Sequence, residues 1–105
     1  MEWKTTFYSD FTIADHFGLN AVKDTYNRAF NEWKNNTEYV TELSMTLNHK
    51  IWEHYYKEQE ETAPQKKEYE DKLARLYDKL WREIDYWCIK NLKGKDLNYY
   101  YQITD

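Results

Sequence analysis

The stretch Tyr69–Trp87, which reads YEDKLARLYDKLWREIDYW, decides the fold of this chain. Its large apolar residues recur at alternating spacings of three and four, which places them on one face of an α-helix, as in the seam of a helical bundle. This stretch predicts a helix over residues 63–92, which follows a capping sequence at Thr62–Gln65 and ends before Gly94. The residues of its apolar face are Tyr69, Leu73, Leu76, Leu80, Ile84 and Trp87, widened by Tyr77, Trp81 and Cys88.

A second long helix is predicted over Thr37–Lys57, and a loop at residues 57–63 joins the two as an antiparallel hairpin. The Asn48 amide is expected to hydrogen-bond across the bundle or to a loop carbonyl. A helix that is apolar on two sides either lies sandwiched in a core or offers one side to a partner. The main apolar stripe is Val40, Leu43, Leu47, Ile51 and Tyr55, and a second stripe, Met45, His49, Trp52 and Tyr56, points away from it.

Shorter elements flank this hairpin. Ser9 and Asp10 can cap a short helix that runs to Phe17, and Asn20 can cap a helix over about residues 21–35 that covers one side of the hairpin. The apolar face of this second helix consists of Val22, Tyr26, Ala29, Phe30 and Trp33. Residues 2–8 fit an extended arm or edge strand, and Lys95–Tyr101 fit a last helical turn. We therefore predict a single all-α domain over residues 1–105, a compact bundle of three main helices with a short first helix and an N-terminal extended arm.

The composition restricts the class of protein. Among 105 residues, 20 are Trp, Tyr or Phe and only 15 are Leu, Ile or Val, while two glycines and one proline are too few for the turns of an all-β fold. The net charge of −4 offers no basic excess for a nucleic-acid backbone. No apolar run approaches the roughly 20 residues of a membrane span, and the N-terminus lacks a signal-peptide pattern. We expect a soluble cytoplasmic protein that does not contact a membrane.

Residues with catalytic or metal-binding chemistry are sparse. His49 with Glu53, and His54 with Glu58, are spaced to share one helical face, but two ligands are too few for a structural zinc ion. The single cysteine, Cys88, lies on an apolar face and is expected to be buried and inert. We therefore predict no catalytic residues, no metal and no cofactor, and a protein that is not an enzyme.

The surplus of aromatic residues instead favours a binding surface, because Trp and Tyr are enriched at interface hot spots. Residues 35–62 carry six Glu against two Lys. This acidic region could therefore contact a basic groove on a partner. The alternative is that the second stripe packs against the first helix and the arm. The predicted partner-binding residues are Met45, His49, Trp52 and Tyr56 on the second stripe, with Glu58, Glu60 and Glu61 in the acidic loop.

Two other uses of the aromatic surplus are open. The same surface could close a symmetric homodimer, as in a self-associating structural or replication accessory protein. The run Tyr99–Tyr101 cannot point one way, so at least one of its rings should be exposed and could stack on single-stranded bases. Direct nucleic-acid binding is the less favoured reading, since a basic groove would have to come from Lys90, Lys93 and Lys95.

Several segments resemble a group of small proteins from phages and mobile elements of gut bacteria. They are Ser9–Gly18, Asp24–Lys34, Thr41–Trp52 and Leu92–Gly94 with its aromatic tail, and together they span most of the chain. No catalytic residues come with this resemblance. What it implies is a protein that binds a host protein, in the style of the anti-CRISPR proteins that block Cas nucleases, and that acts by steric blocking.

Overall fold

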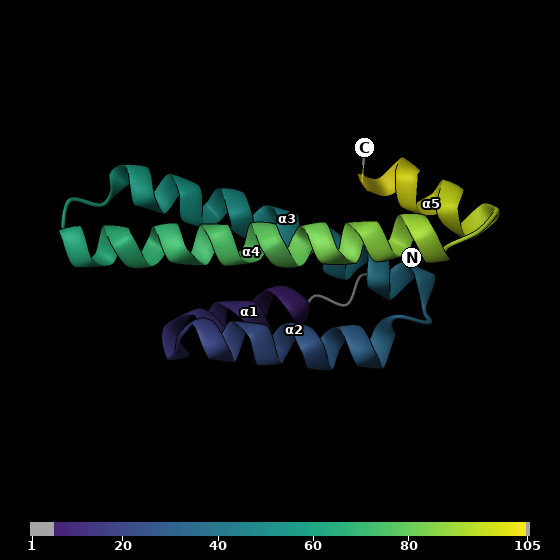
Figure 1. Cartoon of the computed structure of the whole chain (residues 1–105), viewed down its shortest axis with the longest axis horizontal. Coiled ribbons are helices and arrows are strands. Elements are labelled where there is room, and N and C mark those ends of the chain that lie inside the picture. The colour runs from purple at the N-terminus through teal and green to yellow at the C-terminus, as the bar shows by residue number, and fades with distance from the viewer. Residues whose placement is uncertain (1–5, 105) are drawn as a thin grey trace.

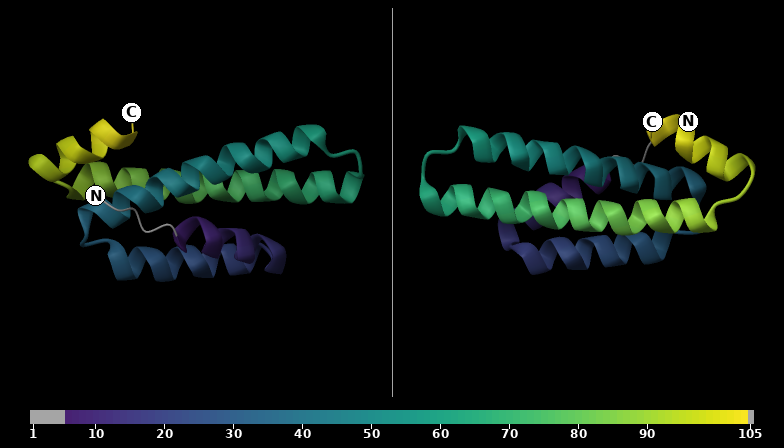
Figure 2. Two further views of the ribbon diagram at one scale, coloured as in Figure 1. Left: turned by 180° about the vertical axis from the view of Figure 1, so that it is seen from behind. Right: turned by 45° about the horizontal axis from the view of Figure 1, so that its top comes forward.

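The computed structural model describes residues 6–104, and over this range the chain folds into five α-helices without a strand (Figure 1). Helices α3 and α4 form a long antiparallel hairpin, the α1–α2 pair lies along one side of it, and α5 folds back beside its open end (Figure 2). The all-α prediction is confirmed. The helices are α1 (Thr6–Phe17), α2 (Leu19–Trp33), α3 (Thr37–Glu60), α4 (Pro64–Asn91) and α5 (Lys95–Thr104).

The predicted hairpin of the two long helices is present, but its turn is capped differently from the prediction. Ala63, not Thr62, occupies the N-cap position of α4, and its methyl group cannot cap the helix. The Glu61 carboxylate instead accepts hydrogen bonds from the backbone N–H groups of Thr62 and Ala63, both at 3.0 Å. Pro64 begins the helix, where its missing N–H costs nothing.

The two helices of the α1–α2 pair are joined by Gly18 alone, whose φ of 118° lies in the region that favours glycine. The predicted caps are wrong on both sides of this glycine. Ser9 and Asp10 lie inside α1, and Asn20 lies inside α2, because each helix begins earlier than its nearest capping residue. A single connecting residue leaves no room for a separate N-cap after Gly18.

The N-terminal strand prediction fails where the structure describes it. Thr6, Phe7 and Tyr8 form the first turn of α1, while residues 2–5 lie outside the described range. Phe7, Phe11 and Ala14 recur at helical spacing and are all buried. An extended conformation would turn Phe7 away from this apolar face, so burial favours the earlier helix start.

The count of main helices also needs correction. The C-terminal segment that was predicted as one turn is the ten-residue helix α5. It is held by Tyr100, which is buried and shares its hydroxyl group between Ser44 of α3, at 2.9 Å, and Asp85 of α4, at 2.7 Å. With α1 and α5 counted as helices in their own right, the bundle has five members within the described range.

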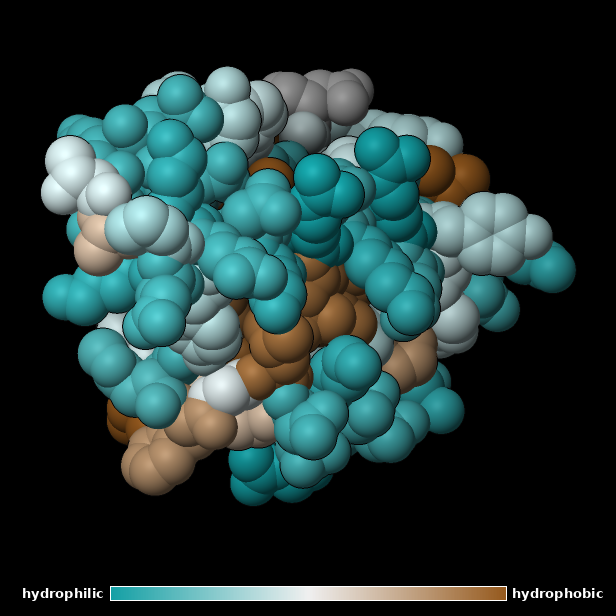
Figure 3. Space-filling view, turned by 60° about the vertical axis from the view of Figure 1, so that its left-hand side comes forward, coloured by the Kyte–Doolittle hydropathy of each residue, from teal (hydrophilic) through white to brown (hydrophobic). Residues whose placement is uncertain are grey.

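One hydrophobic core draws on all five helices. It includes the predicted apolar faces of the helices that became α2 and α4, and Cys88 is fully buried in it, as expected. Around the core, the face shown in Figure 3 is mostly hydrophilic, with hydrophobic side chains visible in a hollow near its middle. Within the described residues, no helix combines the length and apolarity needed to cross a bilayer.

Candidate protein-binding face

Helix α3 has one side that no other helix of residues 6–104 covers, and we call this side the α3 face. At 100° per residue, its members point within about 60° of the direction of Trp52. All of them are exposed except Asn48, which is half-buried. The α3 face consists of Met45, Asn48, His49, Trp52, Tyr55, Tyr56 and Gln59.

The centre of the α3 face is a cluster of three aromatic rings. Trp52 is 53% exposed, and its ring centroid lies 5.9 Å from that of Tyr55 and 6.3 Å from that of Tyr56. The rings of Tyr55 and Tyr56 are 5.8 Å apart. The indole N–H of Trp52 donates to the Asn48 side chain at 3.1 Å, so Asn48 does not bond across the bundle as predicted. This bond and the ring contacts restrict the side-chain conformations of the cluster in the absence of a partner.

None of the side chains of the α3 face carries a formal charge when His49 is neutral. That absence is unusual in a chain with 32% charged residues. Single exposed aromatics are common on soluble proteins, but a contiguous patch of them marks an interaction surface. The cores of protein interfaces share this composition, since they are depleted in charge and enriched in Tyr and Trp.

The same side of α3 is covered nearer to its N-terminus. Thr41 points in nearly the same direction as Trp52 and is fully buried, as is Ser44, which contacts Tyr100 of α5. Helix α5 therefore covers this side before Met45, and the α3 face begins where that cover ends (Figure 1). One helix already packs on this side of α3 within the chain.

The predicted binding residues do not all share this face. Met45, His49, Trp52 and Tyr56 come together on it, and Glu60 lies exposed beyond its C-terminal end. Glu58 is half-buried on another side of the helix, and the Glu61 carboxylate is engaged in the turn before α4. The alternative packing against the first helix holds for His49, whose ring contacts that of Tyr8 at 5.5 Å.

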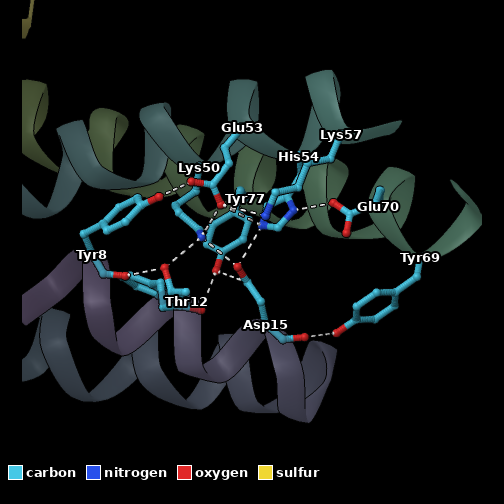
Figure 4. A network of polar contacts seen from close by, with 11 residues as sticks. Tyr8, Thr12, Asp15, Lys50, Glu53, His54, Lys57, Tyr69, Glu70 and Tyr77 are labelled. Atoms are coloured by element: carbon cyan, nitrogen blue, oxygen red, sulfur yellow. Dashed lines mark hydrogen bonds and ion pairs between the residues drawn. The ribbon is translucent and has the colours of Figure 1, made fainter. Parts of the chain in front are cut away.

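The opposite side of α3 holds a buried polar network that the sequence analysis did not predict (Figure 4). The Lys50 ammonium group is fully buried and lies 2.7 Å from a carboxylate oxygen of Asp15 and 2.7 Å from one of Glu53. Asp15 comes from α1, so its pair with Lys50 joins α1 to α3, whereas Glu53 lies on α3 itself. The main stripe was therefore wrong at its C-terminal end, where Tyr55 is exposed and Lys50 points inward.

His54 extends this network toward α4. Its Nε2 atom lies 2.8 Å from Asp15, and its Nδ1 atom lies 2.6 Å from Glu70. Its ring also stacks on that of Tyr77, with centroids 5.5 Å apart. Both ring nitrogens are thus engaged with carboxylates, which leaves neither one for a proton transfer to a substrate.

The network favours the ionised state of two of its carboxylates, Asp15 and Glu53. Burial raises the pKa of Asp15, but hydrogen bonds from His54, Lys50 and Tyr77 outweigh it and bring that pKa below its ordinary value. Burial likewise opposes ionisation of Glu53, whereas hydrogen bonds from Lys50 and Tyr8 lower its pKa. Burial, followed by the hydrogen bond to Asp15, raises the pKa of the Tyr77 hydroxyl group.

Asp15, Glu53 and His54 are close enough together to offer ligands to a metal ion. The Lys50 ammonium group already lies between the two carboxylates and supplies the positive charge that such an ion would bring. The structure therefore favours a polar link between helices over a metal site at this position.

The remaining candidates have less to offer a ligand. Burial, then the nearby Asp85, raises the pKa of the Cys88 thiol to about 12, so it stays protonated and unreactive at neutral pH. In the tyrosine run, Tyr100 is buried, Tyr99 is half-buried and Tyr101 is 39% exposed. One exposed ring agrees with the prediction, but the run is not a platform of three rings.

Two of the hollows among the described residues lie beside α1. One, of about 450 Å³, lies between α1 and α2. The other, of about 600 Å³, lies at the N-terminal end of the α3 face and is lined by residues that include Tyr8, Met45, His49 and Ile103. Neither is lined by Asp15, Lys50 or His54, but Tyr8, whose hydroxyl group donates to Glu53, lines the second hollow.

No protein-family model, no curated protein and no solved structure matches this chain.

Proposed function

We propose that this protein is a non-enzymatic protein-binding module whose docking surface is the α3 face. The observation that carries the proposal is the uncharged, aromatic side of α3 between Met45 and Gln59, which begins where the cover by α5 ends. Its positions follow the a, d and e spacing of a helical heptad, which suits a partner that presents an α-helix. Trp52 and Tyr56 are the anchors of this contact, because large aromatic side chains carry most of the energy of such interfaces.

A photo-cross-linking residue in place of Tyr56 tests this proposal in cells of a bacterial host. We expect a covalent adduct with another polypeptide, whether a host protein or a second copy of this chain. The matched control carries the same residue in place of Tyr86, which is 65% exposed but belongs to α4. Equal labelling at both positions, or none at position 56, would remove the α3 face as a docking surface.

A narrower form of the proposal is that the partner is a host-defence nuclease, such as a Cas nuclease, and that the module inhibits it by steric blocking in the bacterial cytoplasm. It is supported by the resemblance to phage and mobile-element proteins and by the exposed carboxylate of Glu60 beside the α3 face. The test is cleavage of target DNA by the purified nuclease with and without this protein. The double variant Trp52→Ala/Tyr56→Ala should lose any inhibition, and Tyr86→Ala should keep it.

Single-strand binding through the tyrosine run is the weaker candidate, because Tyr101 alone is well exposed. A mobility-shift assay at low salt tests it, since the electrostatic contribution to nucleic-acid binding is largest there. A shift that disappears in Tyr101→Ala would support this candidate over the protein-binding module.

A further inference from the structure

We propose that α5 is an autoinhibitory cover, which occupies part of the side of α3 on which a partner docks and must move away before the docking surface reaches its full length. This inference rests on the proposed function, because it names the regulation of the same site. One side of α3 continues from the α3 face into the stretch beneath α5. At 100° per residue, Thr41 points within about 20° of the direction of Trp52, yet it is fully buried.

Helix α5 lies in the path of a partner helix on this side of α3 (Figure 2). The hydroxyl group of Tyr100 contacts that of Ser44 at 2.9 Å. Nearer the end of α5, Ile103 lines the hollow that Met45 and His49 also line. A helix that docks along the α3 face therefore meets the end of α5 at Met45 and can go no further while α5 is in place.

Release of α5 lengthens the surface that α3 offers. With a rise of 1.5 Å per residue, the stretch from Met45 to Gln59 is about 21 Å long, whereas the stretch from Thr37, where α3 begins, is about 33 Å long. A stable interface buries about 800 Å² on each partner, and the longer stretch comes nearer to that area. A partner that binds the longer stretch thus competes directly with α5.

The attachment of α5 is narrow. Tyr100 is the only buried one of its ten residues, while Leu97 and Ile103 are half-buried. The Tyr100 hydroxyl group donates to Asp85 of α4 at 2.7 Å, and its oxygen accepts from Ser44. Elements that bury few apolar side chains open at lower free energies than the core does. We therefore expect α5 to open before the α3–α4 hairpin unfolds.

The side of α3 beneath α5 can face water because its side chains are polar. The Thr41 hydroxyl group donates to the carbonyl of Thr37 at 2.7 Å, within α3 itself, so it keeps this bond when α5 leaves. The Ser44 hydroxyl group can turn to water or to a carbonyl of the preceding turn. Asp85, which is half-buried, can accept from water instead of Tyr100. Opening therefore leaves none of these groups without a hydrogen bond.

Gly94, between α4 and α5, is the hinge of this movement. Its φ of 55° lies in the left-handed region that favours glycine, and α5 folds back onto α3 from this conformation. A Cβ atom at this position would meet no other atom within 4 Å, so alanine adds backbone strain without a clash. Gly94→Ala should therefore destabilise the closed position of α5 without a change in the α3 face.

Hydrogen–deuterium exchange of the full chain, read by mass spectrometry, tests whether α5 opens by itself. We expect the amides of α5 to exchange at least about tenfold faster than those in the middle of α4. Gly94→Ala should accelerate the exchange of α5 by about tenfold, the factor that corresponds to left-handed strain at an alanine. Gly94→Asn is the matched control and should have a smaller effect, because asparagine tolerates this conformation better. Exchange of α5 that is as slow as that of α4 in the wild-type chain would overturn the inference.

Photo-cross-linking at position 56 in host cells tests the regulation. Apparent affinity scales with the fraction of the binding-competent form, so Gly94→Ala should raise the yield of the adduct by up to about tenfold. Tyr100→Phe removes both hydrogen bonds of the anchor and should act in the same direction, whereas Tyr101→Phe, on the exposed side of α5, should not. Far-UV circular dichroism checks that each variant keeps its helical content. A yield that falls in Gly94→Ala would make α5 a part of the docking surface and overturn the inference.

The two proposals fail in different ways. An adduct at position 56 whose yield is the same in the wild-type chain, Gly94→Ala and Tyr100→Phe would exclude the autoinhibitory cover and leave the docking surface in place. No adduct at position 56 in any of these chains would exclude the docking surface, and the regulation with it.

Discussion

The two sides of α3 reverse the usual distribution of charged and aromatic residues. The inner side holds Lys50 and His54, both almost completely buried, whereas the outer side carries exposed Trp52 and Tyr56 and no formal charge over the length of the α3 face. The polar groups of Lys50 and His54 are retained inside because carboxylates of Asp15 on α1 and Glu70 on α4 contact them directly. Within residues 6–104, no other helix packs on the outer rings of Trp52 and Tyr56 in this way. The comparison teaches that polarity alone does not tell which side of a helix faces a core, since a neighbouring helix can supply either kind of contact.

Removal of Lys50 should disturb the inner side most. Lys50→Met leaves Asp15 and Glu53 close together without their ammonium partner, and breaking a buried ion pair in this way costs about 3 kcal/mol or more. Urea unfolding, followed by circular dichroism, measures the loss. The control Lys57→Met removes an exposed lysine from the same helix and should change the free energy of unfolding by less than about 0.5 kcal/mol. Equal stability of the two variants would mean that the network does not stabilise the fold.

Loss of the Tyr77 hydroxyl group should have the next largest effect. In Tyr77→Phe, Asp15 loses a hydrogen bond to its charged carboxylate inside the core, which should lower the free energy of unfolding by about 2 kcal/mol. Tyr69→Phe is the matched comparison, because that hydroxyl group donates to the uncharged carbonyl of Asp15 and should cost about 1 kcal/mol. The reverse order would show that the carboxylate of Asp15 is not the centre of the network.

Acid should weaken the inner side before it affects the outer one. Asp15 and Glu53 have pKa values below their ordinary range in the folded chain, so the stability that they contribute is complete above the unfolded carboxyl pKa of about 4. That contribution is lost as the pH falls through their lower folded values. Thermal unfolding measured from pH 6 down to pH 2 should show a decline below about pH 4. Asp15→Asn should be less stable at pH 6 and should show a shallower decline.

The outer side should tolerate change with the smallest effect on stability. Trp52→Ser combined with Tyr56→Ser removes two exposed rings, and we expect the free energy of unfolding to change by no more than about 0.5 kcal/mol at concentrations where the chain is monomeric. Chemical denaturation at low protein concentration checks this. A loss above about 1.5 kcal/mol would assign both rings to the core and not to an interface.

Much of the architecture could be predicted from helical periodicity. The seam of α4 and the apolar face of α2 could be predicted because their positions are apolar along the whole stripe. The second stripe of α3 is exposed, as the prediction of a binding surface requires. The predicted helix starts at Ser9 and Asn20 were wrong, because burial of Phe7 and the one-residue link at Gly18 outweigh side-chain capping. Local rules describe single helices, whereas these boundaries depend on neighbouring ones.

The buried network was harder to predict. The stripe that passes through Leu43 and Leu47 continues at the same helical spacing through Lys50 and His54, but a lysine and a histidine ordinarily indicate the surface. Their partner Asp15 lies 35 residues before Lys50 in the chain, and a single sequence does not pair them. The continuous helical spacing from Leu43 to His54 was the one signal in the sequence that Lys50 and His54 face the core.

The buried thiol of Cys88 gives this protein a reporter of its own local opening. It is the only cysteine in the chain, and it lies in the core near Tyr100, which anchors α5. A thiol reagent can reach it only when a helix that covers it, such as α5 or α2, moves away or when the bundle unfolds. The rate of labelling under native conditions therefore measures how often this end of the molecule opens, without any added probe. If a partner bound at the α3 face restrained α5, the reagent would label Cys88 more slowly, whereas a partner that displaced α5 would speed the labelling. The partner would have either effect without contact with the sulfur atom.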